Sequence, residues 1–285
     1  MENCIYKIKT IELSETIFDT VCDCTYILLC CGENPHRLPS VLKNIQILRP
    51  TRYVKLIFNK GYKQCPISIS VNNDLINAQK FIFNDALTNG FKRIMYLEDD
   101  FELENPIEKK DRDEIVNFIT VENPSVYGLC NFTIPTMSTL TSYHNKSLYN
   151  MIGMTHAMIY NSNAMKNIYT YFDNYKGDKN SLGVDTSIYT VPNISVYRYY
   201  KPLIFQKFST TDNQKLGWKN MMGELNATIC IKCVKLLKLD RQFQPGFTII
   251  YLLPYFLYVI LLVMIITIVM YLQRKYKHYN KYGKM

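Results

Sequence analysis

Short apolar runs and amphipathic stretches alternate in the first part of the chain. Three runs of β-branched and apolar residues, at 25–31, 53–58 and 94–97, are typical of strands buried on both faces of a parallel sheet. Apolar positions recur at helical spacing between them, over 38–48 and 74–90. This alternation predicts an α/β fold of the Rossmann-like kind, with a mostly parallel sheet flanked by helices.

The pattern continues less regularly after residue 100. A charged stretch at 104–117 predicts a surface turn with a short helix. Further strands are expected over 126–132, 151–160 and 195–205, and a helix over 161–171. These elements extend the same sheet toward residue 205.

The C-terminal part has a different composition. Residues 247–272 form a run of 26 residues without a charge, longer than the roughly 20 that a spanning helix needs. Aromatic residues crowd its start and close its end, as at membrane interfaces. The predicted organisation is a lead-in at 1–24, an α/β domain at 25–223, a basic amphipathic juxtamembrane helix at 224–246, a transmembrane helix at 247–272 and a basic tail at 273–285.

The charge is distributed unevenly and bears on the partners. The formal net charge is +9, of which residues 1–228 carry +1 and residues 229–285 carry +8. Basicity confined to the flanks of an apolar helix favours a membrane surface, and it argues against nucleic acid as a partner.

The start of the chain and its cysteines suggest a compartment. No apolar segment opens the sequence, so we expect a single-pass, tail-anchored protein with its domain in the cytosol. Nine irregularly spaced cysteines do not predict a disulfide framework. A lumenal orientation stays open, because basic residues flank the apolar run on both sides; it would expose four sequons, at Asn131, Asn145, Asn193 and Asn226.

Three consecutive carboxylates are the main candidate for chemistry. Glu98, Asp99 and Asp100 directly follow the buried strand 94–97. Ligands of open α/β sheets bind just beyond the carboxyl ends of the strands, and adjacent carboxylates repel one another unless a cation shares them. The pattern predicts a metal site that holds a phosphorylated ligand. A solvated turn is the alternative interpretation.

These residues resemble the acidic DxD-type motif of the GT-A class of nucleotide-sugar-dependent glycosyltransferases. The motif LEDD at 97–100 is similar to the strand end of the lipopolysaccharide and procollagen galactosyltransferase family. The run THAMIYNS at 155–162 is similar to that family's GHAY-type strand. GVD at 183–185, followed by YKPLIFQ at 200–206, is similar to its VD…YxPLxxQ pattern. The resemblance covers about residues 25–218, with Glu98 standing where the class more often has Asp.

The resemblance implies a GT-A-like fold and assigns roles on the donor side. It implies that Asp100 binds Mn²⁺ or Mg²⁺ and that Glu98 reaches the metal or the donor ribose. It implies a UDP-sugar as the first candidate donor. Further donor-binding candidates are Asp99, Arg37, Asn77 and Lys80.

The same resemblance assigns the acceptor side. It implies that Asp185 is the base that takes the proton of the acceptor hydroxyl, although a loop Asp is also a common helix cap. His156 and Gln206 are candidate acceptor-binding residues. Each has a structural alternative, because a histidine in an apolar strand and a glutamine after one often only complete the core.

The function expected from these residues is the transfer of a hexosyl residue from a nucleotide-sugar to a hydroxyl of a glycan, protein or lipid. A non-catalytic, membrane-anchored binding or scaffold protein with the same fold is the alternative. A metal-dependent nucleotidyl- or phosphotransferase is disfavoured, because the chain has no Gly-rich phosphate loop followed by Lys.

Overall fold

The computed structural model describes most of the chain. The residues it describes are 6–29, 35–65, 68, 70–130, 143–149, 155–175, 188–207, 232, 236, 238, 241 and 249–282. The chain forms two compact units, Met1–Pro245 and Gly246–Met285.

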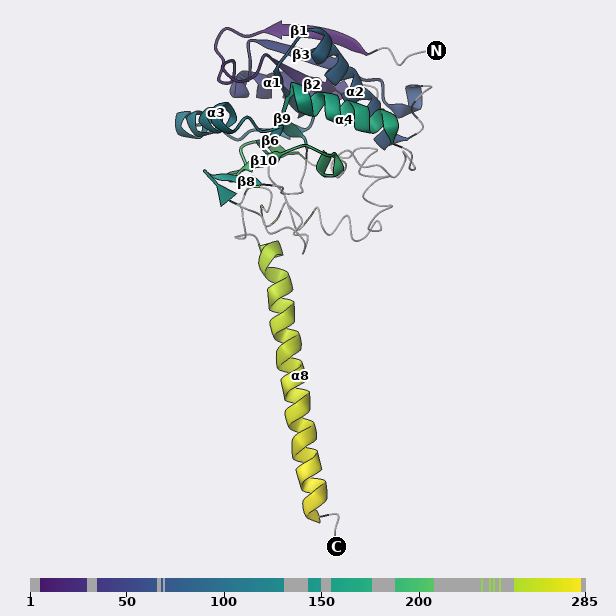
Figure 1. Cartoon of the computed structure of the whole chain (residues 1–285), viewed down its shortest axis with the longest axis vertical. Coiled ribbons are helices and arrows are strands. Elements are labelled where there is room, and N and C mark those ends of the chain that lie inside the picture. The colour runs from purple at the N-terminus through teal and green to yellow at the C-terminus, as the bar shows by residue number, and fades with distance from the viewer. Residues whose placement is uncertain are drawn as a thin grey trace. The chain divides into compact units, whose positions relative to one another are not determined.

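The first unit is an α/β domain (Figure 1). Its strands are β1 Lys7–Glu12, β2 Cys24–Leu29, β3 Tyr53–Phe58, β4 Arg93–Glu98, β5 Phe101–Glu102, β6 Val126–Gly128, β7 Tyr143–His144, β8 Ser147–Tyr149, β9 Ala157–Asn161, β10 Val196–Tyr199 and β11 Phe205–Gln206. Its α-helices are α1 Leu38–Leu48, α2 Val71–Thr88, α3 Lys109–Glu122 and α4 Ser162–Asn174, and its 3₁₀ turns are η1 Pro35–Arg37, η2 Tyr62–Gln64 and η3 Ile188–Thr190.

The main sheet has the strand order β1-β3-β2-β4-β9-β6-β10-β8-β7. Strands β2, β3, β4, β6, β7 and β10 run in one direction, and β1, β8 and β9 run against them. The expected α/β class with a mostly parallel sheet is therefore confirmed. Strands β5 and β11 form a separate two-stranded sheet beyond the end of β4.

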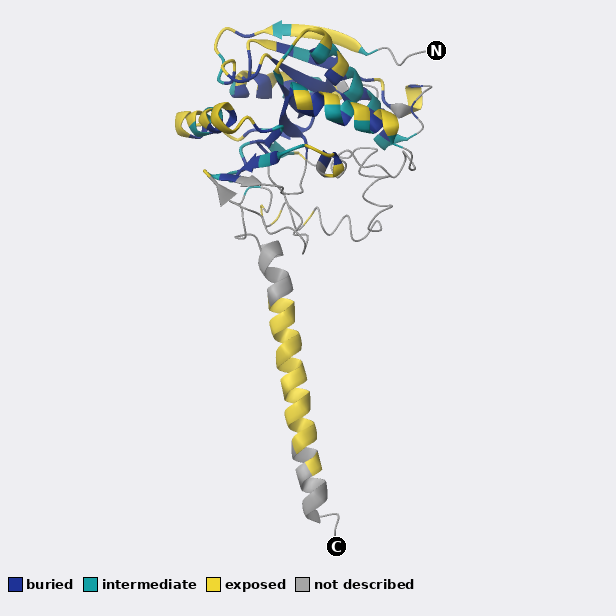
Figure 2. Ribbon diagram, viewed as in Figure 1, coloured by how far each residue is buried: buried dark blue, intermediate teal, exposed yellow. Residues whose placement is uncertain are grey.

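Helices cover both faces of the sheet. On one face α2 packs beside α4, and Phe83 of α2 contacts the ring of Tyr160 on β9. On the other face Phe118 of α3 contacts Tyr127 of β6. Tyr127 pairs with Ile159 of β9, whose side chain points to the face opposite that of the next residue, Tyr160, because successive residues of a strand alternate between faces. Every residue of β2 and of β9 is buried between these layers (Figure 2). The continuous apolar runs in the sequence therefore mark strands that are covered on both sides.

The N-terminal segment is more than the lead-in predicted for 1–24. Residues Lys7–Glu12 form β1, which pairs antiparallel with β3 at the sheet edge, and Phe18 is fully buried in the core. The sequence pattern does not predict this strand, because nearly all of its side chains are exposed and no buried face alternates with an exposed one. Charged side chains on an edge strand are a common protection against further pairing.

Several boundaries differ from the predicted ones for local reasons. Helix α2 begins at Val71 rather than at 74, because the Ser70 hydroxyl caps it by accepting from the Asn73 amide at 3.2 Å. Helix α3 extends to Glu122, where the predicted helix was short. The strand predicted at 195–205 divides into β10 and β11 around Pro202. Of the juxtamembrane helix predicted at 224–246, most residues lie outside the described ones.

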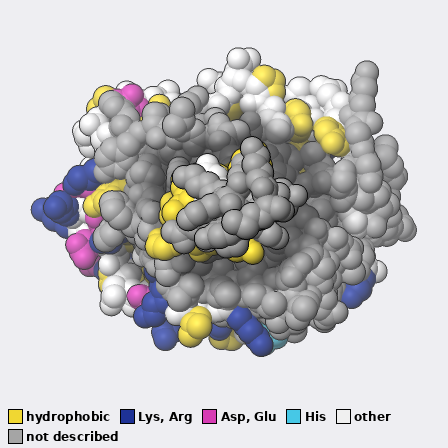
Figure 3. All heavy atoms as spheres, turned by 90° about the horizontal axis from the view of Figure 1, so that it is seen from below, with side chains coloured by type: hydrophobic (Ala, Val, Ile, Leu, Met, Phe, Trp, Pro, Cys, Tyr) yellow, Lys and Arg dark blue, Asp and Glu magenta, His cyan; other side chains and the backbone are white. Residues whose placement is uncertain are grey.

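The second unit is the helix α8, Ile249–Tyr282. Its segment Phe256–Gln273 has a mean hydropathy of 2.5, and its described side chains are exposed. Seen from below in Figure 3, hydrophobic side chains project on several sides of this helix. By length and composition α8 is able to cross a membrane. It continues beyond the predicted span of 247–272 into the basic tail.

The cysteines that the structure describes are in two states. Cys22, Cys24 and Cys130 are buried thiols that form no disulfide. Cys65 is disulfide-bonded, which the irregular spacing of the nine cysteines did not predict.

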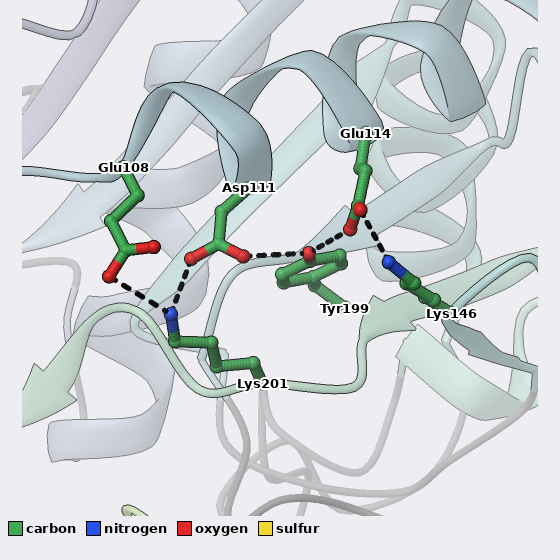
Figure 4. Close-up of polar contacts among 6 residues, drawn as sticks. All are labelled: Glu108, Asp111, Glu114, Lys146, Tyr199 and Lys201. Atoms are coloured by element: carbon green, nitrogen blue, oxygen red, sulfur yellow. Dashed lines mark hydrogen bonds and ion pairs between the residues drawn. The ribbon is translucent and has the colours of Figure 1, made fainter.

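A polar network built around the buried residues Tyr199 and Asp111 connects α3 to β10 and to the β7–β8 turn (Figure 4). The hydroxyl of Tyr199 on β10 lies 3.0 Å from Asp111 and 2.5 Å from Glu114, both on α3. Lys201 donates to Asp111 at 2.5 Å, and Lys146 of the β7–β8 turn pairs with Glu114. Burial and the two carboxylates raise the pKa of Tyr199, so the phenol stays a hydrogen-bond donor.

Replacing Tyr199 with Phe is expected to destabilise the domain. The change leaves two carboxylates without their shared donor, at a cost of about 1–3 kcal/mol. The melting temperature of the full chain in detergent, followed by circular dichroism, measures this. Tyr53→Phe, at an exposed ring, is the matched control. Equal melting temperatures for the two variants would contradict a stabilising role for the network.

Candidate active site

The three carboxylates lie where parallel strands end side by side. In the sheet, Glu98 pairs with Leu28 of β2, and Leu29 pairs with Phe58, the last residue of β3. The carboxyl ends of β2, β3 and β4 therefore share one edge, and Glu98, Asp99 and Asp100 leave the sheet there. This is the edge where open α/β sheets bind ligands. We call these three residues the acidic tip.

Two residues near α1 hold the acidic tip in place. Arg37, in the 3₁₀ turn before α1, forms an ion pair with Asp99, and both side chains are buried. Asn44 of α1 donates from its amide to the Phe101 carbonyl at 2.6 Å. A buried carboxylate requires such a partner, because removing an ion from water costs several kcal/mol. Arg37 is thus part of the site, with its guanidinium directed at Asp99.

Asp100 is positioned by the strand β11. Its Oδ2 accepts from the Gln206 amide at 2.9 Å, and its carbonyl accepts from the Lys207 amide at 2.8 Å. Its Oδ1 is buried and has no hydrogen-bond partner in the part of the chain that the structure describes. Only 7% of Asp100 is exposed, so this oxygen also lacks ready hydration. An unpaired buried carboxylate oxygen is costly unless a cation or another donor occupies the position beside it.

His156 lies beside the acidic tip at the start of β9. Its carbonyl accepts from the Glu98 amide at 3.0 Å, and its ring Nε2 lies 3.3 Å from the Ile204 carbonyl, which makes Nε2 the donor. Burial lowers the pKa of His156, but Cys130 and the carboxylates of Asp100 and Glu98 outweigh burial and raise it. A positive imidazole here would offset the negative charge of the tip.

Cys130 and Arg198 complete this buried environment. Arg198 is fully buried and donates to the Cys130 carbonyl at 2.8 Å. Burial raises the pKa of the Cys130 thiol, but His156 and Arg198 outweigh burial and lower it. Sequence reasoning missed both residues, because a single Cys and an Arg within a strand carry no motif.

The two candidates on α2 contact other groups. Lys80 forms an ion pair with Asp173 of α4, and its ammonium lies 5.0 Å from the centre of the Tyr169 ring. Asn77 donates to Asn73 at 3.3 Å and to Ser68 at 3.4 Å. Among the described residues, neither side chain contacts the acidic tip. Their donor-binding roles stay predictions.

A second polar cluster lies at the end of β3, on the same edge of the sheet. Asn59, directly after β3, donates to Asp74 of α2 at 2.7 Å, and Ser68 donates to the same carboxylate at 2.9 Å. Burial raises the pKa of Asp74, although these hydrogen bonds oppose the shift. The signal that could have revealed this cluster is the polar residue Asn59 directly after an apolar strand.

The predicted base lies outside the described residues. Asp185 falls within 176–187, so neither its position nor its distance from the acidic tip enters the description of the site.

The donors of the tip suit a magnesium- or manganese-like ion. Within the described residues no group of three or more His, Cys, Asp and Glu side chains is placed to hold a metal. Such hard ions commonly bind through only one or two carboxylates and take their other ligands from substrate phosphates and water. Asp100, whose Oδ1 has no hydrogen-bond partner among the described residues, fits this smaller donor set, and a shared role for Glu98 stays a prediction.

Comparison with known proteins gives one kind of match. No protein-family model matches the chain, and no curated protein does. Among solved structures, the chain is similar to a glycosyltransferase involved in the glycosylation of the major capsid of PBCV-1. The sequences are 10% identical, the alignment covers 66% of this chain and 94% of the other, and the TM-score is 0.39. A similarity of this strength leaves the function of this chain open.

Proposed function

We propose that the protein is a glycosyltransferase that moves a hexosyl residue from a nucleotide-sugar to a hydroxyl acceptor with the help of a divalent cation. The observation that carries the proposal is Asp100, which lies at the shared carboxyl edge of three parallel strands with a buried oxygen that has no hydrogen-bond partner among the described residues. The motifs at 97–100, 155–162 and 200–206 support the same reaction.

The residues of the tip have separate roles in this proposal. Asp100 and Glu98 would hold Mn²⁺ or Mg²⁺, which supplies the Lewis acidity that offsets charge on the departing diphosphate. Gln206 orients Asp100 through a 2.9 Å hydrogen bond. Arg37 holds Asp99, which lies between Glu98 and Asp100, through an ion pair. These contacts preorganise the carboxylates, so little reorganisation is required when the donor binds.

The acceptor side of the proposal rests on sequence motifs. Asp185 would accept the proton of the acceptor hydroxyl, and His156 and Gln206 would line the acceptor position. His156 is buried, which suits a residue that supports the acceptor position from the interior of the domain. A UDP-sugar is the first donor to test.

Membrane attachment through α8 is part of the proposal, with the domain on the cytosolic side. The buried thiols of Cys22, Cys24 and Cys130, which form no disulfide, are compatible with that side. The disulfide at Cys65 is the observation that favours the opposite, lumenal side, because disulfides persist in oxidising compartments.

The reaction is tested with the full chain in detergent, Mn²⁺ and a panel of nucleotide-sugars, by following release of free nucleotide. We expect one donor to be turned over. Asp100→Asn should lower the rate by about 100-fold or more, because it removes a metal-binding charge while preserving shape. Asp113→Asn, at an exposed carboxylate of α3, is the matched control.

Two results would contradict the proposal. A folded protein that turns over no donor would favour a binding or scaffold module. A product that carries the nucleotide instead of the sugar would favour a nucleotidyltransferase.

A second variant tests how Asp100 is oriented. Gln206→Leu removes the amide that donates to Asp100, so the Mn²⁺ concentration for half-maximal turnover should rise by about 10–100-fold. Lys207→Ala, at the neighbouring exposed side chain, should leave that concentration unchanged. An identical Mn²⁺ dependence in wild type and Gln206→Leu would assign Gln206 to packing alone.

The orientation is tested in cells through Asn145, an exposed residue of the β7–β8 turn within a sequon. With the domain in the cytosol, endoglycosidase treatment leaves the mobility of the full chain unchanged. A mobility shift that disappears in Asn145→Gln would place the domain in a lumen.

A further inference from the structure

A second candidate binding site lies on α4. A cavity of about 430 Å³ opens between the C-terminal half of this helix and the segment that follows η3. The residues that line it are Asn167, Thr170, Tyr171, Asn174, Tyr175, Val191, Pro192 and Asn193. This volume suits a small ligand such as one or two sugar rings.

The helix presents two distinct faces. Ala164, Met165, Ile168 and Phe172 are buried in the core of the domain. The cavity residues Asn167, Thr170, Tyr171 and Asn174 follow the spacing i, i+3, i+4 and i+7, so they form one stripe beside the apolar one. The sequence of α4 thus specifies a polar and aromatic surface as well as a core-facing one.

The lining residues that the structure describes carry no charge, although charged residues are close by in the sequence. Asp173 lies next to Asn174 but forms an ion pair with Lys80 of α2. Among the eight lining residues there is no Lys, Arg, His, Asp or Glu. A phosphate, a carboxylate or an amine would gain no charged partner from these eight residues, so their chemistry favours a neutral ligand.

Three amides converge on the cavity with their hydrogen-bonding capacity available. In the described part of the chain, no hydrogen bond is recorded for the side chains of Asn167, Asn174 and Asn193. Each amide offers two donor hydrogens and an acceptor oxygen. A purely apolar ligand would desolvate these groups without compensation, whereas adjacent hydroxyl groups would satisfy them.

Aromatic rings supply the complementary apolar surface. The rings of Tyr171 and Tyr175 lie 5.9 Å apart at an angle of 47°. Thr190 donates to the Tyr171 hydroxyl at 3.1 Å, which links the two walls of the cavity. The opposite wall is held by Val191, which is buried, and by the turn at Asn193, whose φ is 60°. Flat apolar rings beside free amides match a pyranose, which has C–H faces and hydroxyl edges.

We propose that this cavity is a binding site for a neutral saccharide, separate in residues from the acidic tip. It goes beyond the proposed transfer reaction, because it concerns binding and requires no turnover. If both proposals hold, the site would retain a glycan acceptor or product while transfer proceeds at the acidic tip.

The test uses the full chain in detergent, produced in a bacterial host so that the sequon at Asn193 carries no glycan. Saturation-transfer NMR is recorded with uncharged methyl glycosides of glucose, galactose, mannose and N-acetylglucosamine. We expect at least one of them to bind. Asn174→Ala should weaken that binding about 10-fold, as the loss of one or two hydrogen bonds predicts.

Matched variants separate a binding role from a folding role. Asn163→Ala removes an exposed amide from the first turn of α4, outside the cavity, and should leave binding unchanged. Tyr171→Phe retains the ring and should retain binding, whereas Tyr171→Ala should abolish it. Asp100→Asn should lose transfer and keep saccharide binding, so the two proposals fail independently. Absence of binding by every glycoside, or equal affinity in the Asn174 and Asn163 variants, would overturn the proposal.

Discussion

The burial of negative charge at the end of β4 is the constraint on which the site depends. Asp99 and Asp100 are both almost fully buried, and they follow directly on Glu98. Adjacent buried carboxylates repel one another and lose their hydration, so they persist only where positive or hydrogen-bond-donating groups surround them. Arg37 supplies one such group to Asp99, and Gln206 supplies another to Asp100.

These supporting groups come from separate parts of the chain. Arg37 and Asn44 come from the α1 region, His156 from the start of β9 and Gln206 from β11. The α1 region reaches the tip by packing against β5, His156 by the pairing of β9 with β4, and Gln206 by the pairing of β11 with β5. Oδ1 of Asp100, which has no hydrogen-bond partner among the described residues, is thereby held in place, as the proposed cation-binding position would require.

The two proposed sites differ in physical character. The acidic tip is buried, charged and organised by ion pairs, which suits a cation and a diphosphate. The described residues that line the cavity on α4 are uncharged and include amides and aromatic rings, which suits a neutral saccharide. If both proposals hold, such a division would let one domain recognise a charged donor and an uncharged glycan without either site competing for the other ligand.

The sequence by itself determined the elements whose side-chain pattern is strong. Helix α1 and strand β3 have the predicted bounds, 38–48 and 53–58, because a continuous apolar run or a regular helical stripe survives in almost any tertiary context. The apolar span in α8 and the placement of the acidic residues at a strand end were also evident from the sequence.

Tertiary structure alone decided β1, whose polar sequence becomes a strand because β3 offers an open edge. It also decided which distant residues meet the acidic tip: Gln206 reaches Asp100 only because β11 pairs with β5, while Lys80 is engaged by α4. Local pattern records whether a residue is buried, but the partners of a buried charge depend on strand order and helix packing, which bring together residues far apart in the chain.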